Sequence, residues 1–371
     1  MKLLTYICSL LLLLMPQYTF PTEGGPDLTS GFEQGNPHIK SINAMAFGPE
    51  GILFLGDSHH AKIVAMDTED QVSRGAADRI SMKQIDHKIA SLVGTTADKL
   101  SIQDMAVNPI SKTIYIAAHL EDGTPVLVKT SGENLELVSL ESASFSVTDL
   151  TNPIKADAKD RRGRSQRKWA ISDMAYFDGQ VMVSGLSNEE FGSTFRSINF
   201  PFSDQQKYST LEIFHAAHGK YETHSPIKTF MPYKLNGEAH ILASYTCTPL
   251  VIFPLSEMKA GEHTKGKTVA ELGNRNTPLD IISYENNGKS YLLMANSSRA
   301  LMKIDPEKVA SYTDFLTEPV KENSAIAGVE FLNMPYVFVT QLDDYNEQAV
   351  LMIRRQANGS LDMETVSKRR L

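Results

Sequence analysis

The hydrophobic and polar positions of this chain repeat as one phrase six times. Each copy opens with an apolar residue and two or three polar or small ones. A hydrophobic strand, a turn and a second hydrophobic strand ending on a polar group then follow. The copies begin every 48–69 residues, at Ile42, Ile102, Ile171, Pro226, Pro278 and Ile326. Self-similarity at such a period is typical of propellers and solenoids.

The turns inside these copies predict hairpins. Asp178-Gly179 and Asn286-Asn287-Gly288, for example, separate apolar runs of strand length, and these residues favour tight turns. A third strand is expected after most copies, at residues 62–68, 125–130, 250–255, 300–305 and 349–355. A fourth is expected at residues 87–94, 135–140, 209–214, 267–272 and 361–366.

Four antiparallel strands in each repeat, with few helical periods, predict an all-β fold. We expect a single β-propeller of six four-stranded blades over residues 42–371, preceded by a lead-in segment at residues 23–41. The long second repeat leaves a seventh blade open, and an open solenoid is the competing architecture. The closed ring is favoured because closure removes exposed strand edges.

The first residues predict export. Lys2 is followed by an apolar run, after which Pro16 and Pro21 break any helix. This run is too short to span a bilayer comfortably and is typical of a signal-peptide core. We place the signal peptide at residues 1–22, with cleavage between residues 18 and 25, and an uncleaved membrane anchor is the alternative. After cleavage we expect a periplasmic or secreted protein without a membrane span.

Charge and cysteine content limit the classes of binding partner and the disulfides that the chain could have. The formal net charge is −8 at pH 7, which argues against nucleic acid because its binders present a basic face. Cys8 lies in the expected signal peptide, so the mature chain would keep only Cys247 and form no intrachain disulfide. The expected partner is a small-molecule ligand or another exported protein.

One blade carries a family resemblance. Residues 47–57 read FGPEGILFLGD, which resembles the Phe-x-Pro-x-Gly-x-Leu signature of NHL-repeat and gluconolactonase-like propellers. The resemblance implies six blades and a ligand site at one mouth of the central channel. Gluconolactonase-like enzymes hold a divalent ion there through Glu, Asn and Asp side chains. In this chain Asn43 and Ala44 stand where the acid of the first blade is expected.

Polar residues recur at two repeat positions that we expect to share one mouth, namely the start of the innermost strand and the end of the second strand. Their convergence would form a ligand site. The alternative is that each Asp only accepts hydrogen bonds from nearby backbone. The candidate ligand-binding residues are Asp57, Asp104, Asp173, Tyr245, Asp280, Asn296, Arg299 and Gln341.

Histidines are a second signal. The segment HAAHGKYETH, which contains His215, lies just before the fourth copy. Neutral imidazole with carboxylate support is a common transition-metal ligand. The alternative is structural or solvated histidines, and the HEXXH signature is absent. We expect a divalent or transition-metal ion as the candidate cofactor, at a site formed by His59, His60, His119, His218 and His224.

Two further features leave alternatives open. Cys247 follows an apolar strand, so it is either a small buried hydrophobe or a nucleophilic thiol. Residues 155–168 form the one dense charge run. This run is either a solvated loop or a basic flap over the mouth.

The absence of several motifs reduces the number of candidate function classes. No haem-attachment motif, P-loop, Rossmann glycine fingerprint or nucleophile elbow occurs. We expect an exported propeller with a small-molecule site at the channel mouth, and metal-assisted hydrolysis or isomerisation is one chemistry for it. The alternatives are a non-catalytic binding or scaffold propeller for another exported or envelope protein, and a redox subunit with a non-covalent cofactor. The sequence leaves open whether the protein is an enzyme.

Overall fold

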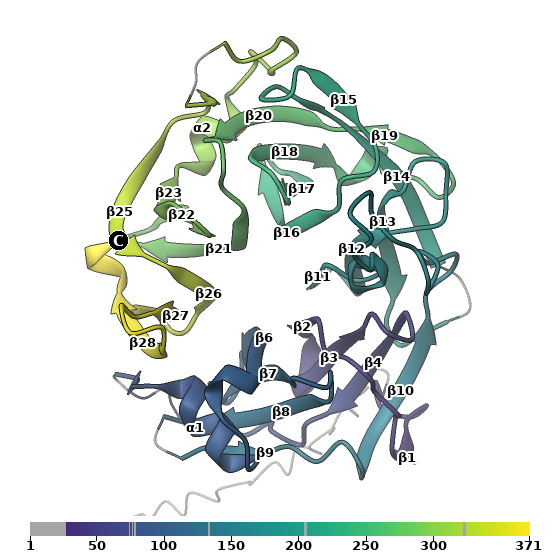
Figure 1. The fold of residues 1–371 in the computed structure, drawn as a ribbon, viewed down its shortest axis with the longest axis vertical. Coiled ribbons are helices and arrows are strands. Elements are labelled where there is room, and N and C mark those ends of the chain that lie inside the picture. Colours follow the sequence, from purple (N-terminus) through teal and green to yellow (C-terminus); the bar gives the residue numbers. More distant parts are fainter. Residues whose placement is uncertain are drawn as a thin grey trace, which may run out of the picture.

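The computed structural model describes residues 27–73, 75, 77, 79–132, 134–203, 206–321 and 324–371. Six sheets stand around a central axis (Figure 1), and their strands pair antiparallel except for one parallel pair in the third blade. The expected six-bladed β-propeller is therefore confirmed, and a seventh sheet is not found among the described residues. The expected signal peptide, residues 1–22, lies outside the described residues, and the lead-in segment is described from residue 27 onward.

Blades 3, 4 and 5 follow the repeat closely, and we number the blades by the order of their inner strands along the chain. Blade 3 contains β11 (Asp173–Phe177), β12 (Gln180–Leu186), β13 (Ser193–Asn199), β14 (Gln206–His215), β15 (Lys220–Glu222) and β19 (His263–Lys265). Blade 4 contains β16 (Ile227–Leu235), β17 (Glu238–Tyr245), β18 (Pro249–Pro254), β20 (Lys267–Leu272) and β24 (Ile326–Gly328). Blade 5 contains β21 (Pro278–Asn286), β22 (Lys289–Asn296), β23 (Ala300–Ile304) and β25 (Phe331–Val337).

Blades 1 and 6 each include a strand from a distant part of the chain, whereas blade 2 has four consecutive strands. Blade 1 contains β2 (Ala44–Phe47), β3 (Ile52–Asp57), β4 (Lys62–Asp67), β10 (Ala143–Asp149) and β1 (Glu33–Gly35). Blade 2 contains β6 (Leu100–Val107), β7 (Ile114–Leu120), β8 (Pro125–Thr130) and β9 (Glu136–Leu137). Blade 6 contains β26 (Val339–Asp344), β27 (Ala349–Arg355), β28 (Leu361–Ser367) and β5 (Ser81–Met82).

The hairpin turns follow from local chemistry. Asp178-Gly179, Asn236-Gly237 and Asn287-Gly288 have positive φ at both central positions. Asn, Asp and Gly adopt that conformation more readily than other residues, and such turns match the twist of antiparallel strands. The inner and second strands of blades 3, 4 and 5 are joined by these turns.

The blades do not follow one another around the ring in chain order. Inner strand β2 contacts β6 on one side and β11 on the other, while β26 contacts β6 and β21. The order around the ring is therefore blade 2, 1, 3, 4, 5, 6. After blade 2 the chain returns to blade 1 as β10, and the earlier strand β5 completes blade 6. Pairing of β5 with β28 ties the N-terminal part of the chain to the C-terminal blade.

Some of the strand predictions are wrong. Residues 87–94 were expected to form a strand, but α1 (Ile85–Leu92) occupies most of them. Ile85 and Ile89 are fully buried at helical spacing, so this short apolar run follows the helical period. Among the described residues the other helix is α2 (Pro306–Ala310), and the short 3-10 turns are η1 (Pro49–Gly51), η2 (Ala97–Lys99), η3 (Arg167–Trp169), η4 (Leu255–Glu257) and η5 (Lys368–Arg370).

The sixth copy, beginning at Ile326, is not a hairpin. Its residues supply β24, β25 and β26 to three different blades. Phe338 has a φ of 58° between β25 and β26, and the chain passes from blade 5 to blade 6 there. Residues 349–355 are accordingly the second strand of blade 6, and residues 361–366 lie in its third. Short apolar runs cannot specify their pairing partners, which explains the misassignment.

The core consists of six buried apolar clusters, one at each junction between neighbouring blades. Between blades 1 and 3, for example, the Phe54 ring packs 5.8 Å from the Tyr176 ring. This packing fixes each blade against its neighbours and thus fixes the turns at the mouths. No helix of the described residues combines the length and the apolar character needed to cross a bilayer.

Candidate functional site

The central channel is lined by residues of all six inner strands around a cavity of about 370 Å³. Five aspartates line this channel: Asp344, which forms an ion pair with Lys368, and four others that each lie on the inner strand of a different blade. Asp104, Asp173 and Asp280 were expected from the repeat, whereas Asp343 was missed because β26 was misassigned. The four aspartates are Asp104 on β6, Asp173 on β11, Asp280 on β21 and Asp343 on β26.

Each of these carboxylates accepts a hydrogen bond from a backbone N–H in the neighbouring blade. The distances are 2.6 Å from Met45 N to Asp104, 2.8 Å from Phe230 N to Asp173, 2.6 Å from Leu342 N to Asp280 and 2.6 Å from Val107 N to Asp343. As in the alternative stated for the sequence, each aspartate accepts a hydrogen bond from backbone. The donor, however, lies in the neighbouring blade and not in the same turn. The recurring aspartates join adjacent inner strands.

Burial changes the acidity of the channel carboxyls. It raises the pKa of both Asp280 and Asp343 to about 7, and the nearby charge of Asp173 adds to the effect at Asp280. Burial, followed by the charges of Asp173 and Asp280, raises the pKa of Asp104 well above its usual range. The four side chains keep some water-accessible surface toward the channel. Protonation of these carboxyls is therefore favoured in the folded protein.

The other expected ligand-binding residues mostly form local contacts. Fully buried Asp57 accepts hydrogen bonds from Lys40 N at 3.0 Å and Ser41 Oγ at 2.8 Å. Tyr245 is buried, and burial raises the pKa of its hydroxyl. The remaining three donate to nearby carbonyl groups: Asn296 to Met294 O at 3.0 Å, Arg299 to Asn274 O at 3.2 Å and Gln341 to Gln103 O at 3.0 Å.

The five histidines expected to form a metal site do not gather in one place. His59 and His60 are neighbours with ring centroids 5.1 Å apart, and Nδ1 of His60 lies 2.9 Å from Asp57. His119 accepts a hydrogen bond from Ile42 N at 2.9 Å, and burial lowers the pKa of its ring. His224 lies 2.9 Å from the Thr223 hydroxyl. His218 alone of the five joins a group with metal-ligating geometry among the described residues.

That group consists of His215, His218 and Cys247, which we call the His–Cys cluster. One donor atom of each side chain lies within 4.8 Å of the other two. Glu222 contacts both rings, at 3.2 Å from His215 Nδ1 and 2.7 Å from His218 Nδ1. Burial opposes protonation of His215, but Cys247, Glu222 and Glu271 together raise the pKa of its ring to about 9. The same contacts with His215 and His218 hold the pKa of Glu222 far below its usual range despite burial.

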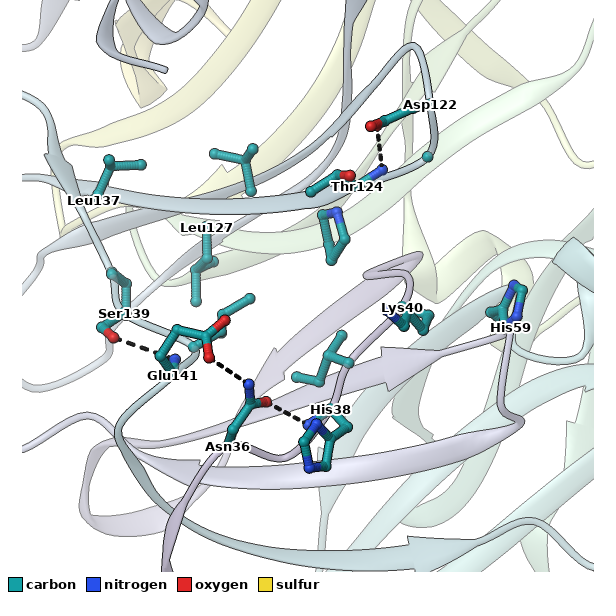
Figure 2. Close-up of a pocket in the computed structure, with 16 residues that line it drawn as sticks. Asn36, His38, Lys40, His59, Asp122, Thr124, Leu127, Leu137, Ser139 and Glu141 are labelled. Atoms are coloured by element: carbon teal, nitrogen blue, oxygen red, sulfur yellow. Dashed lines mark hydrogen bonds between the residues drawn. The ribbon is translucent and has the colours of Figure 1, made fainter. Parts of the chain in front are cut away.

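A larger cavity of about 740 Å³ lies between the lead-in segment and blade 2 (Figure 2). Its apolar lining includes the buried side chains of Ile39 and Leu127 and the exposed side chain of Leu137. Glu141 accepts a hydrogen bond from Asn36 Nδ2 at 2.6 Å. Three basic side chains also line the cavity, namely His38, Lys40 and His59. Of the residues that line it, only His59 was expected from the sequence.

The basic segment at residues 155–168 contacts the turn that carries His59, beside this cavity. Asp160 accepts hydrogen bonds from Arg162 N at 2.8 Å and from Arg164 N at 2.9 Å. Arg167 Nε donates to the carbonyl of His59 at 3.1 Å. The segment contains seven basic and two acidic residues. It therefore brings positive charge to the turn that carries His59, beside the cavity.

Comparisons with models of known protein families and with curated protein sequences find no match. Solved structures similar to this chain include a chain of a mitotic checkpoint complex, at 8% identity and a TM-score of 0.37, with 98% of this chain and 100% of that chain covered. The PQQ-bound aldose sugar dehydrogenase of Streptomyces coelicolor has 11% identity and a TM-score of 0.37, with 90% and 96% covered. A putative oxidoreductase (glucose dehydrogenase) of Thermus thermophilus has 10% identity and a TM-score of 0.37, with 90% and 98% covered.

Proposed function

We propose that this protein is a ligand-binding propeller and that its ligand is a small amphipathic carboxylate. The cavity between the lead-in segment and blade 2 carries this proposal, because it combines an apolar lining with basic side chains on its wall. Its volume of about 740 Å³ falls in the range of small-molecule sites, which are concave and mostly apolar with a few placed polar groups.

The apolar part of the ligand would lie against Ile39, Leu127 and Leu137. Ile39 and Leu127 are buried and fixed by their neighbours, whereas the side chain of Leu137 is 52% exposed at the rim. An exposed leucine loses water contact when a ligand covers it, which favours binding. We therefore expect an alkyl or aryl body of the ligand to bind at this side of the cavity.

The carboxylate of the ligand would meet His38, Lys40 and His59. Within the described residues, no carboxylate lies within ion-pair distance of the Lys40 ammonium group or of the His59 ring. The two acidic side chains of the cavity already accept hydrogen bonds, Glu141 from Asn36 and Asp122 from Thr124. The basic segment at residues 155–168 would raise the local concentration of an anionic ligand.

The test uses decanoate and its neutral counterpart decanol as probes, with binding measured by isothermal titration calorimetry. We expect decanoate to bind more tightly than decanol. Lys40→Gln should weaken decanoate binding roughly 10- to 150-fold, because a charge-assisted hydrogen bond contributes about 1.5–3 kcal/mol. Lys259→Gln removes another exposed lysine, outside the cavity, and should change nothing. Equal affinity for both probes, or no effect of Lys40→Gln, would contradict the proposal.

We also infer that the chain is exported, as the apolar run within residues 1–22 suggests. The test is fractionation of a bacterial host that expresses the full chain, followed by N-terminal sequencing of the exported form. A mature N-terminus between residues 18 and 25 is expected. A chain that stays in the cytoplasm with its first residues intact would refute the inference.

A scaffold role is the second candidate, favoured by an exposed apolar edge on blade 5. Leu332 and Val337 on β25 are 65% and 48% exposed, and Phe338 beyond them is 55% exposed. Within the described residues β25 pairs on one side only, with β23. An extended segment of another exported protein could add a strand to this edge. A photo-crosslinker at Leu332 should then give one discrete adduct in the cell envelope, and Leu332→Lys with the crosslinker at Asn333 should abolish it.

A further inference from the structure

The His–Cys cluster lies at the junction of blades 3 and 4, on the mouth where the inner strands begin. His215 ends β14, His218 lies in the turn before β15, and Cys247 lies in the turn between β17 and β18. Two blades therefore supply the three side chains. The decanoate cavity is formed by other residues, on the lead-in segment, blade 1 and blade 2.

The distances in the cluster suit one metal ion. One donor atom of each residue lies within 4.8 Å of the others. Ligands of a tetrahedral ion with metal–nitrogen bonds of about 2.0–2.1 Å and a metal–sulfur bond of about 2.3 Å stand roughly 3.3–3.6 Å apart. Side-chain rotations that move the donor atoms by about 1 Å would therefore bring them to metal-binding distance, with no rearrangement of the blades.

Glu222 holds the imidazole ring of His218 in the orientation that a metal ligand needs. It accepts the hydrogen bond of His218 Nδ1 at 2.7 Å, and the Ser225 hydroxyl donates to it at 2.8 Å. Metal-ligating histidines commonly give one ring nitrogen to a carboxylate, which fixes the ring and leaves the other nitrogen for the metal. For His218 this leaves Nε2 free to ligate.

His215 supplies an independent observation. Its side chain is 1% exposed, yet its Nδ1 makes no hydrogen bond, because the 3.2 Å contact with Glu222 lacks hydrogen-bond alignment. Buried polar atoms are nearly always satisfied, so an exception needs an explanation. A bound ion that shifts the ring would supply one.

The charge around the cluster also favours a cation. Fully buried Glu271 lies 3.9 Å from His215 Nε2, and Glu222 lies on the other side of the ring. Glu271 also accepts hydrogen bonds from Ala217 N at 3.0 Å and from the Thr248 hydroxyl. Two carboxylates beside one buried ring would offset much of the charge of a divalent ion.

We propose that His215, His218 and Cys247 bind one transition-metal ion of the zinc and copper class. A thiolate and two imidazoles select such borderline-soft ions, whereas magnesium and calcium prefer oxygen ligands. Coordination needs the Cys247 thiolate and neutral imidazole rings, so the thiol proton of Cys247 and the extra ring proton of His215 both pass to solvent. The His218 side chain is 48% exposed, so the fourth position of the ion faces water. That position is open to a water molecule or an exogenous ligand.

The experiment titrates the full chain, without a histidine tag, with zinc in the presence of a competing chelator and with cobalt as a spectroscopic probe. We expect one equivalent of zinc and, with cobalt, a thiolate-to-metal charge-transfer band. His218→Gln and Cys247→Ser should each weaken zinc binding by more than the roughly 10–100-fold that loss of a ligand's hydrogen-bond partner costs. Cys247→Ser should also remove the charge-transfer band.

His224→Gln is the matched control. His224 lies on the same link and is also exposed, but it is not part of the cluster, so zinc affinity should not change. Equal zinc affinity in the wild type and the two cluster variants, or a cobalt complex without the thiolate band, would overturn the proposal.

A second measurement needs no variant. Zinc should slow alkylation of Cys247 by iodoacetamide at least tenfold, read by mass spectrometry of the peptide that contains Cys247. An unchanged alkylation rate at saturating zinc would overturn the proposal even if the variants failed to fold. Decanoate binding should be unaffected by His218→Gln, so the metal site and the carboxylate site can fail separately.

Discussion

The central channel and the His–Cys cluster both collect potential ligands from more than one blade, yet they use them differently. In the channel, each of four aspartates gives an oxygen to a backbone N–H of the neighbouring blade. In the cluster, His215 Nδ1 makes no hydrogen bond, and His218 keeps one ring nitrogen that Glu222 does not occupy. Convergence of polar groups thus identifies a ligand site only where their hydrogen-bonding capacity is left unused.

The strongest test of the structural role of the channel is Asp173→Ala. The Asp173 carboxylate accepts from both Phe230 N and Met174 N at 2.8 Å. Its loss should lower the free energy of unfolding by roughly 2–4 kcal/mol, because two buried N–H groups lose their partner. Asp173→Asn keeps an acceptor oxygen and should cost less than half as much. Urea unfolding measures both variants, and equal stability of Asp173→Ala and wild type would show that the channel aspartates do not join the blades.

The pH dependence of stability is the second test of the channel. Burial raises the pKa of Asp280 and Asp343 to about 7 in the folded state, and the unfolded values lie near 3.9. The folded protein then binds more protons, so stability is full below pH 4 and is lost as the pH rises through 7. Since water reaches the channel, we expect a loss on the order of 2 kcal/mol per group.

Asp343→Asn isolates one of these groups. The charges of Asp344 and Lys112 act on Asp343 and remain in this variant, while Asp280 loses the nearby charge of Asp343, which contributes to its raised pKa. Urea unfolding between pH 4 and pH 8 should show a flatter profile for Asp343→Asn than for wild type. An identical profile would mean that Asp343 is ionised in the folded protein at pH 5.

In the His–Cys cluster, Glu222→Gln separates a positioning residue from a ligand. The variant should weaken zinc binding roughly tenfold, because the His218 ring loses the carboxylate that orients it. The thiolate-to-cobalt band should persist, since Cys247 still coordinates. Complete loss of that band in Glu222→Gln would instead make Glu222 essential for assembly of the site. Zinc affinity equal to wild type would remove Glu222 from the site.

The smallest expected effect concerns the basic segment at residues 155–168. Arg161 and Arg162 are exposed and belong to the segment whose Arg167 contacts the turn that carries His59. Changing both to Gln should slow decanoate association about threefold at low salt and have no effect at about 1 M salt, where the Debye length is near 3 Å. Stopped-flow measurements of the association rate at both salt concentrations test this. An equal effect at both concentrations would exclude long-range attraction.

Much of the fold could be predicted because its signals are local. Asp178-Gly179 and Asn287-Gly288 adopt the positive φ angles of tight hairpin turns, and the apolar period on either side specifies strands. The reversed order of blades 1 and 2 around the ring was not predictable in this way. It depends on the pairing of β10 with β4 and of β5 with β28, and a short apolar strand does not encode its partner.

The candidate site was predictable only in part. The repeat placed Asp104, Asp173 and Asp280 at one structural position, as observed, but their donors lie in neighbouring blades. His218 was expected to bind metal with His224 and with three histidines of blades 1 and 2, yet its neighbours are His215 and Cys247. The signal for Cys247 was its place at the end of a second strand, where the repeat puts polar groups.

The sequence by itself determined the hairpins, the propeller and the mouth that gathers polar side chains, because turn chemistry and hydrophobic period act over a few residues. Only the tertiary structure decided which polar groups have hydrogen-bond partners within the protein and which remain available to a ligand. Asp173 meets the N–H of Phe230, and Cys247 meets His215, because blade packing brings distant segments together. Hydrogen bonds and metal bonds depend on distances of a few ångströms, which residue spacing along the chain does not specify.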